Sequence, residues 1–118
     1  MIPQTLVTVL QHKDEQEGQQ LLYAQIPAFD DDDLDLLVKL IKRESERQWN
    51  YDPDLSFVLA GHLVTIGELT QNRYYHALGL MARGDALRRM DRDQDALRFL
   101  NAAGEEFLVI GDEVGWAR

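Results

Sequence analysis

The second half of the chain contains one helical repeat followed by the opening of what looks like another. Two segments with helical periodicity and a polar turn between them fill residues 72–110, and residues 111–118 then resemble a new start. A period of about 40 residues is typical of solenoids, whose stacked units together bury an apolar face that no single unit can bury. The pattern therefore predicts a scaffold for binding.

The bulk composition fits one folded domain. The chain has 118 residues, of which 45% are apolar and 28% are charged, and these values are ordinary for a globular protein with one modest core. We expect residues 1–118 to form a single helical-repeat domain. The formal net charge of −9 repels phosphate backbones and anionic lipid surfaces, so neither nucleic acid nor a membrane is an expected partner.

Cysteine is absent from the sequence. Its absence excludes disulfides, thiolate nucleophiles and cysteine-ligated metals, and it is compatible with a reducing compartment. The first residues show neither the basic region nor the apolar run of a signal peptide. We therefore predict a cytoplasmic protein.

Local signals predict helices in the first half of the chain. Pro3 suits the first turn of a short helix, Asp14 can cap a second one, and that helix has to end before Pro27. Four consecutive aspartates at 30–33 precede apolar residues at helical spacing. Carboxylates stabilise the N-terminus of a helix, so the aspartate run predicts a helix start.

The central and C-terminal helices follow from the apolar pattern. Residues 54–71 are apolar nearly all round, which predicts a buried helix in which Gly61 and Gly67 let neighbouring helices come close. A hairpin of helices at 72–90 and 94–110 follows, with a turn expected at 111–112. No segment alternates as a strand does, so the predicted fold is all-α and built of antiparallel helix hairpins.

Large and small residues alternate in the hairpin with a spacing that is known from a repeat family. The positions are Leu80, Gly84 and Leu87 on the first helix and Ala96, Leu100 and Ala103 on the second. This spacing resembles the tetratricopeptide repeat, in which such residues pack the two helices together. Arg83 departs from the pattern, since the repeat usually has leucine there. The resemblance covers residues 72–118 and implies a short right-handed solenoid of stacked hairpins.

The resemblance also implies how the domain is divided and where it belongs. It divides the chain into N-terminal capping helices at 1–29, a divergent helix pair at 30–71, the repeat at 72–110 and the start of a truncated next repeat at 111–118. The C-terminal junction resembles junctions between the repeats of large bacterial signalling and regulatory proteins. We expect the chain to be the N-terminal part of a longer protein of that kind.

No catalytic or cofactor-binding motif is recognisable in the sequence. Ser45 and Ser56 are the two serines, and neither lies in a nucleophile motif. The aspartate run lacks the ligand spacing of a calcium loop, so a helix start is a better interpretation than a metal site. The histidines lack metal-ligand spacing, and we expect His62 to be a hydrogen-bonded residue of the core or of a groove. We therefore predict no enzyme activity, no metal and no cofactor.

Half of the 12 basic residues lie in the last hairpin, at Arg73, Arg83, Arg88, Arg89, Arg92 and Arg98. One interpretation is a basic groove for a carboxylate-rich peptide, because arginine suits paired contacts with carboxylates. The other, which we favour, is local pairing along the helices, of Asp85 with Arg88 and Arg89 and of Asp95 with Arg98. The candidate residues for binding a peptide or partner are Tyr75, His76, Arg83 and Arg88.

These features predict a non-catalytic scaffold that binds a protein or peptide along the face formed by the first helices of the pairs. An alternative is a helical regulatory domain that binds a small ligand or a metal in a pocket around His62 and His76. The last hairpin is also expected to expose apolar side chains, and a homodimer could cover this edge with Trp116 near the contact. The apolar candidates are Phe99, Phe107 and Ile110.

Overall fold

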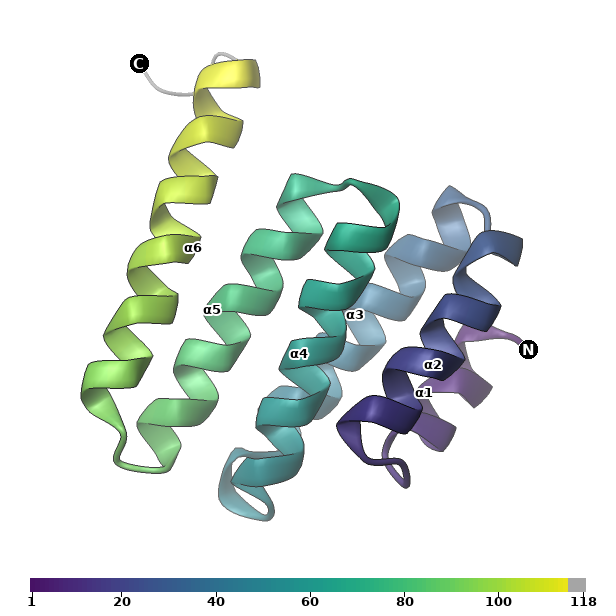
Figure 1. Cartoon of the computed structure of the whole chain (residues 1–118), viewed down its shortest axis with the longest axis horizontal. Helices are drawn as coiled ribbons and strands as arrows, with labels where there is room; N and C mark the ends of the chain where they lie inside the picture. The colour runs from purple at the N-terminus through teal and green to yellow at the C-terminus, as the bar shows by residue number, and fades with distance from the viewer. Residues whose placement is uncertain (115–118) are drawn as a thin grey trace.

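The computed structural model describes residues 1–114, with side chains for residues 1–111, so the prediction made for Trp116 falls outside this range. Every regular element within it is helical (Figure 1). The α-helices are α1 (Pro3–Leu10), α2 (Glu15–Gln25), α3 (Asp31–Arg47), α4 (Pro53–Thr70), α5 (Arg73–Arg89) and α6 (Asp93–Val114). Short 3-10 helices at Ile26–Ala28 and Gln48–Asn50 follow α2 and α3. The described residues contain no strand, which confirms the all-α prediction.

Acidic side chains begin two of the helices, as predicted. Asp14 accepts a hydrogen bond of 2.8 Å from the backbone N–H of Glu17 at the start of α2. Asp30 accepts one of 2.8 Å from the backbone N–H of Asp33 at the start of α3. The side chains of Glu17 and Asp33 accept hydrogen bonds in return from the backbone of the capping residues, which satisfies donors that a helix start leaves unpaired. The aspartate run is therefore the cap and first turn of α3.

The C-terminal end of α6 differs from the prediction. We expected a turn at residues 111–112, but α6 continues to Val114. Glycine costs about 1 kcal/mol relative to alanine in an exposed helix, which favours a helix end. Gly111 is buried, however, and no proline follows it to interrupt the helix. The predicted turn is wrong, because a glycine that no proline follows is tolerated inside a helix.

The helices form a thin slab (Figure 1). α1 lies behind α2 and α3 lies behind α4, while α5 and α6 continue the row beyond α4. The molecule measures 41 × 35 × 20 Å, and its smallest dimension is about twice the diameter of one helix. α4 packs against α2, α3 and α5, and α6 packs against α5. In the described part of the chain α6 is the edge helix, and its last turns extend past the end of α5.

The core is centred on α4, which explains why this helix is apolar nearly all round. Leu59, Leu63 and Ile66 of α4 are completely buried. Its contact with α5 is close, because a Cβ atom added to Gly67 would lie 2.5 Å from the backbone nitrogen of His76. The prediction that Gly67 permits a close helix approach is confirmed. Although α4 is so apolar, neither it nor any other helix in the described range is long and apolar enough to cross a membrane.

Candidate binding groove

A groove runs along α5, with α5 as its floor and α4 and α6 as its walls. His76, Leu80 and Leu87 line the floor on one face of α5. Three hollows of about 270, 560 and 440 Å³ follow one another along it, and neighbouring hollows share lining residues. From His76 to Leu87 the floor is about 16 Å long, because a helix rises 1.5 Å per residue. We call this surface the α5 groove.

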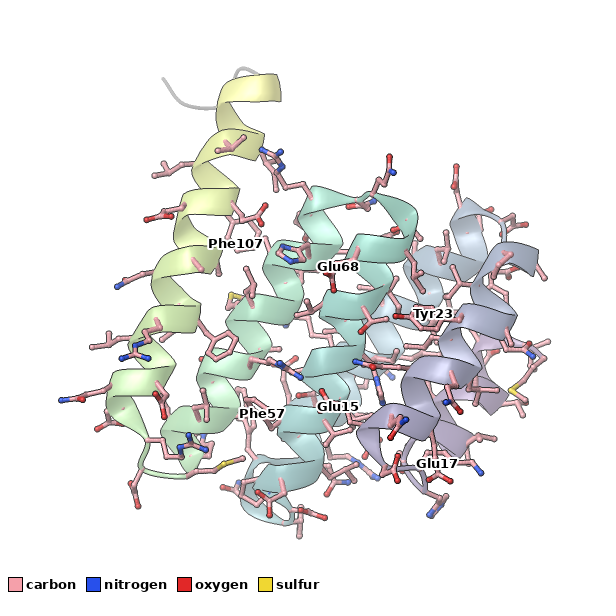
Figure 2. The ribbon with its side chains drawn as sticks, viewed as in Figure 1. Glu15, Glu17, Tyr23, Phe57, Glu68 and Phe107 are labelled. Atoms are coloured by element: carbon pink, nitrogen blue, oxygen red, sulfur yellow. The ribbon has the colours of Figure 1, made fainter. Side chains whose placement is uncertain are left out.

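One end of the α5 groove is apolar. Phe57 of α4, Leu87 of α5 and Phe99 of α6 line a hollow of about 440 Å³. The rings of Phe57 and Phe99 meet edge to face with their centroids 6.3 Å apart, so side chains of α4 and α6 touch. Figure 2 shows Phe57 between α4 and α5. The charged residues at this end are Arg92, Asp95 and Arg98. Such aromatic and aliphatic walls suit an apolar side chain of a ligand.

Arg83 connects this apolar end with α2. Its guanidinium carbon lies 4.4 Å from the centre of the Phe57 ring and 6.0 Å from that of Phe99, within the range of attraction between a cation and an aromatic face. Its Nη2 donates a hydrogen bond to Glu15 of α2, whereas its Nε is buried without a partner among the described residues. Arg83 therefore helps to fix both aromatic rings in place.

The opposite end of the α5 groove is polar. Nδ1 of His76 lies 2.7 Å from Oε1 of Glu106 on α6, within hydrogen-bond distance. Nε of Arg73 lies 3.6 Å from the other carboxylate oxygen of Glu106. Figure 2 shows Glu68 on α4 at this end, and Gln71 also lines the hollow. Donors and acceptors face the same space here, so this end suits a polar group of a ligand.

The α5 groove includes only part of the predicted partner-binding set. His76 lies on its floor, and Arg83 lies beside its apolar end. Tyr75 belongs to the core, with 8% of its surface exposed, and burial raises the pKa of its hydroxyl above the usual value. Arg88 lines a separate hollow of about 410 Å³ next to Leu97. The structure thus brings His76 and Arg83 to one surface and places Tyr75 and Arg88 elsewhere.

Asp85 was predicted to pair with Arg88 and Arg89, and of these two it pairs with Arg88 only. Nη1 of Arg88 lies 4.0 Å from Oδ1 of Asp85. Burial raises the pKa of the Asp85 carboxyl, and the positive charge of Arg88 partly opposes that rise. Arg89 lies over the ring of Trp49 instead, with its guanidinium carbon 4.4 Å from the ring centre. The pair of Asp85 with Arg89 is wrong, because stacking on an aromatic face holds this arginine.

The predicted pair of Asp95 with Arg98 is also wrong. Asp95 accepts hydrogen bonds of 2.7 and 3.1 Å from Nη2 and Nε of Arg92. Arg92 directly precedes α6 and reaches the carboxylate with two donors, which is stronger than one contact. Arg98 is exposed and has no ion pair with a residue in the described range.

The residues of the repeat resemblance lie mostly where α5 meets α6. Gly84 of α5 faces Leu100 of α6, where an added Cβ atom would lie 2.6 Å from the leucine Cγ. Leu80 and Leu87 also form part of the groove floor. The members that are almost fully buried are Leu87, Ala96 and Ala103. Small residues on both helices therefore allow α5 and α6 to approach each other.

The most exposed apolar residues of α6 are not those predicted. Phe99, Phe107 and Ile110 are half-buried. Phe107 makes an edge contact with Tyr74 of α5 at a centroid distance of 6.1 Å, and Figure 2 shows it between α5 and α6. Leu108 is the most exposed apolar side chain described on α6. The difference arises because α5 already covers the face that holds the aromatic residues.

His62 and His76 lie in different environments. His62 is completely buried, which confirms its predicted place in the core. Neither of its ring nitrogens has a hydrogen-bond partner among the described residues, so the predicted hydrogen bond is wrong. Its ring lies against Gly18 of α2, where a larger residue would collide with it. Burial, with a smaller effect of Arg83, lowers the pKa of His62 to about 4. The described residues also contain no group of three His, Asp or Glu placed to hold a metal ion.

The aromatic pair of the α5 groove was missed in the sequence. Phe57 belongs to a helix that is apolar nearly all round, and Phe99 was named only as a candidate for the exposed edge of the last hairpin. A usable signal was present, since His76 and Arg83 are seven residues apart on α5, as Phe99 and Glu106 are on α6. Residues seven apart share one helix face, so these pairs mark the two faces that meet at the groove.

No known protein family, curated protein or solved structure matches this chain. The resemblance to tetratricopeptide repeats therefore stays a prediction. The functional inference rests on the α5 groove and on the chemistry of its two ends.

Proposed function

We propose that this chain is a non-catalytic protein-interaction module whose α5 groove binds a short segment of a partner protein. The observation that supports this function is the continuity of the groove, which joins an apolar hollow to a polar end along one helix. An extended peptide spans about 3.3 Å per residue, so about five residues fill the length of the floor. The α5 groove thus has the dimensions of a short linear motif.

The two ends of the groove define the kind of segment that fits. A bulky apolar side chain would enter the hollow that Phe57 and Phe99 line together with Leu80 and leave water. A polar side chain farther along the segment would bond with His76 or Glu106. Contact between the rings and their stacking with Arg83 shape the hollow in advance, which lowers the entropic cost of binding.

The α5 groove is better suited to binding than to catalysis. The chain has no cysteine. Its serines, Ser45 and Ser56, are completely buried and hydrogen-bonded to each other, and neither lines the groove. His76 faces a carboxylate, Glu106, and no nucleophile that it could activate lies among the residues that line the groove.

The packing of the helices supports a repeat-like architecture for the module. α3 packs with α4 and α5 with α6, while α1 packs against α3 and α2 against α4. We infer a short right-handed array of the tetratricopeptide type, in which residues 1–29 cap the N-terminal end. The negative net charge and the lack of cysteine are compatible with a cytoplasmic part of a larger signalling or regulatory protein.

Peptide selection tests the proposal. Random short peptides displayed on phage are selected on the full chain, and the affinity of the selected peptides is measured by fluorescence anisotropy. Leu80→Arg puts a charge on the apolar floor and should weaken binding at least about tenfold, or 1.4 kcal/mol. Leu69→Arg is the matched control, because Leu69 is exposed on α4 and lines none of the three hollows.

Circular dichroism checks the fold of both variants. If Leu80→Arg loses helical content, Ala102→Arg on the α6 wall takes its place, since Ala102 lines two of the hollows and is partly exposed. Two results would overturn the proposal: that no peptide is selected, or that the selected peptides bind the folded groove variants as tightly as they bind the wild type.

A further inference from the structure

An exposed stripe runs along a face of α6 that does not take part in the α5 groove. It consists of Leu97, Asn101, Gly104 and Leu108, which are four, three and four residues apart and so share one face. Leu97 is 56% exposed and Leu108 is 66% exposed. A Cβ atom added to Gly104 would meet nothing within 4 Å, so the middle of this face is open. We call these four residues the α6 stripe.

Two copies of the α6 stripe are complementary to each other when their helices run in opposite directions. When two α6 helices lie antiparallel, Leu97 faces Leu108 of the second copy, and Asn101 faces Gly104 of the second copy. Each contact then occurs twice about a two-fold axis, as in antiparallel coiled coils. The leucines cover each other, and the missing side chain of Gly104 leaves room for the asparagine.

Charges beside the α6 stripe fit the same arrangement. Arg98 and Glu105 are exposed, lie seven residues apart on one flank of the stripe, and have no ion pair with a described residue. Equivalent flanks meet in an antiparallel helix pair, so Arg98 of each copy faces Glu105 of the other. In a parallel pair, the flank of Arg98 and Glu105 would instead meet the opposite flank of the second copy, which holds the apolar residues Leu100 and Phe107. The charges therefore favour the antiparallel orientation.

The flank of Leu100 adds apolar surface to the contact. Leu97 and Leu100 line a hollow of about 410 Å³ together with Ala96 and Arg88. Leu108 of a second copy, placed opposite Leu97, reaches this hollow. Ala96, Leu97 and Leu100 thus form the apolar part of this hollow, and Arg88 and Asp93 form its polar part.

We propose that the chain forms a two-fold symmetric dimer in which α6 pairs antiparallel with α6 of a second copy through the α6 stripe. The floor of the α5 groove, formed by Leu80 and Leu87, belongs to α5 and stays open in this dimer. The leucines of the α6 stripe line none of the three hollows, whereas Arg98 and Glu105 also line the α6 wall of the groove. The dimer contact therefore borders the groove, and only a substitution within the stripe separates dimerisation from peptide binding.

Charge reversal tests the orientation of the helices. Sedimentation velocity of the full chain, from micromolar to millimolar concentration, measures association. Arg98→Glu places glutamates opposite each other, and Glu105→Arg places arginines opposite each other, so each variant alone should dimerise at least tenfold more weakly than the wild type. An equimolar mixture restores opposite charges at both positions and should dimerise like the wild type. Both variants remain net acidic, so overall charge does not explain such a recovery.

A second pair of variants tests the stripe itself. Leu108→Asp should weaken dimerisation at least tenfold, whereas Leu69→Asp, on an exposed position of α4, should leave it unchanged. Circular dichroism checks that both remain folded. A wild type that stays monomeric at millimolar concentration, a dimer unaffected by Leu108→Asp, or a mixture of charge variants that stays monomeric would overturn the dimer. Peptides selected for the α5 groove should bind Leu108→Asp as they bind the wild type.

Discussion

Arg83 of α5 donates a hydrogen bond to Glu15 of α2, a residue that precedes it by 68 positions. The two side chains meet over Gly61 of α4, where an added Cβ atom would lie 2.7 Å from Oε1 of Glu15 and closer still to Arg83. Figure 2 shows Glu15 where α2 approaches α4. The pair connects the N-terminal helices with the last hairpin across the central helix, and it needs a glycine on α4.

Gly61→Ala should destabilise the protein although alanine is the better helix former. Alanine is favoured over glycine by about 1 kcal/mol in a helix. The new methyl group would displace Glu15 and leave the guanidinium of Arg83 unpaired, which costs about 2–3 kcal/mol. The free energy of unfolding, measured by urea denaturation, should therefore decrease by about 1–2 kcal/mol.

Gly104→Ala is the matched control for this substitution. A Cβ atom at Gly104 meets nothing within 4 Å, so the helix gains stability without a collision, by about 0.5–1 kcal/mol. The measurement is made at low protein concentration, where self-association does not contribute. Equal stability of the two variants would contradict the role given to Gly61.

The buried imidazole of His62 should make the protein less stable as the pH falls from 6.5 towards 4. The pKa of His62 is lowered from 6.5 to about 4 by burial, so in this window the unfolded chain binds more protons than the folded one. Above pH 6.5, His62 is neutral in both the folded and the unfolded chain and does not make stability depend on pH. Between pH 6.5 and about 4, it lowers the free energy of unfolding by about 1.4 kcal/mol for each pH unit. Urea denaturation at a series of pH values measures this slope.

Two histidine variants identify the group responsible. His62→Leu removes the titrating ring and its unpartnered nitrogens, so this part of the slope should disappear, and stability at pH 7 should not decrease by more than about 1 kcal/mol. His12→Gln changes an exposed histidine and should keep the slope. Identical slopes in the wild type and in His62→Leu would show that another group titrates.

Features that depend on a few neighbouring residues were predictable from the sequence. The caps at Asp14 and Asp30 follow from hydrogen bonds that span three residues, and the end of α2 at Gln25 follows from Pro27, which disfavours helical backbone in the residue before it. The end of α6 was not predictable, because a glycine near the end of a helical pattern is compatible both with a C-terminal cap and with a continued helix, and α6 continues through Gly111 to Val114. The partner of Asp95 was not predictable either. Arg92 and Arg98 stand three positions before and after it, and both spacings allow an ion pair.

The candidate site was predictable only on α5. His76 and Arg83 were recognised as polar residues of that helix, but their partners come from elsewhere in the fold. No local pattern connects Glu15 with Arg83, or Phe57 with Phe99. These contacts depend on how α2, α4 and α6 are arranged around α5, and that arrangement results from core packing along the whole chain.

Asp30→Ala should destabilise the protein more than Asp32→Ala. Asp30 caps α3 through a hydrogen bond to the backbone of Asp33, and losing such a cap costs about 1 kcal/mol. Asp32 is exposed in the first turn and acts through the helix dipole alone, which is worth about 0.3–1 kcal/mol. Thermal denaturation ranks the two variants. A melting temperature that rises by several degrees in millimolar calcium would instead indicate a cation site.

Ser45 and Ser56 form a reciprocal pair where α3 meets α4. The Ser45 hydroxyl donates to the backbone oxygen of Ser56 at 2.9 Å, and the Ser56 hydroxyl donates to that of Ser45 at 2.7 Å. Their Oγ atoms are 3.0 Å apart, and both side chains are completely buried. The two serines, which carry no catalytic motif, therefore join two helices of the core.

Substituting both serines should cost less than the sum of the single substitutions. Ser45→Ala and Ser56→Ala should each lower the free energy of unfolding by about 1 kcal/mol, because each removes a buried hydrogen bond. The first substitution also removes the contact between the two Oγ atoms, so the second substitution removes fewer interactions than it does in the wild type. Residues in such contact commonly show a coupling energy of at least about 0.5 kcal/mol. Thr8→Ala, which removes an exposed hydroxyl bond within α1, should combine additively with Ser45→Ala. Urea denaturation of the single and double variants measures both cycles, and additivity of the serine cycle would show that the hydroxyls act independently.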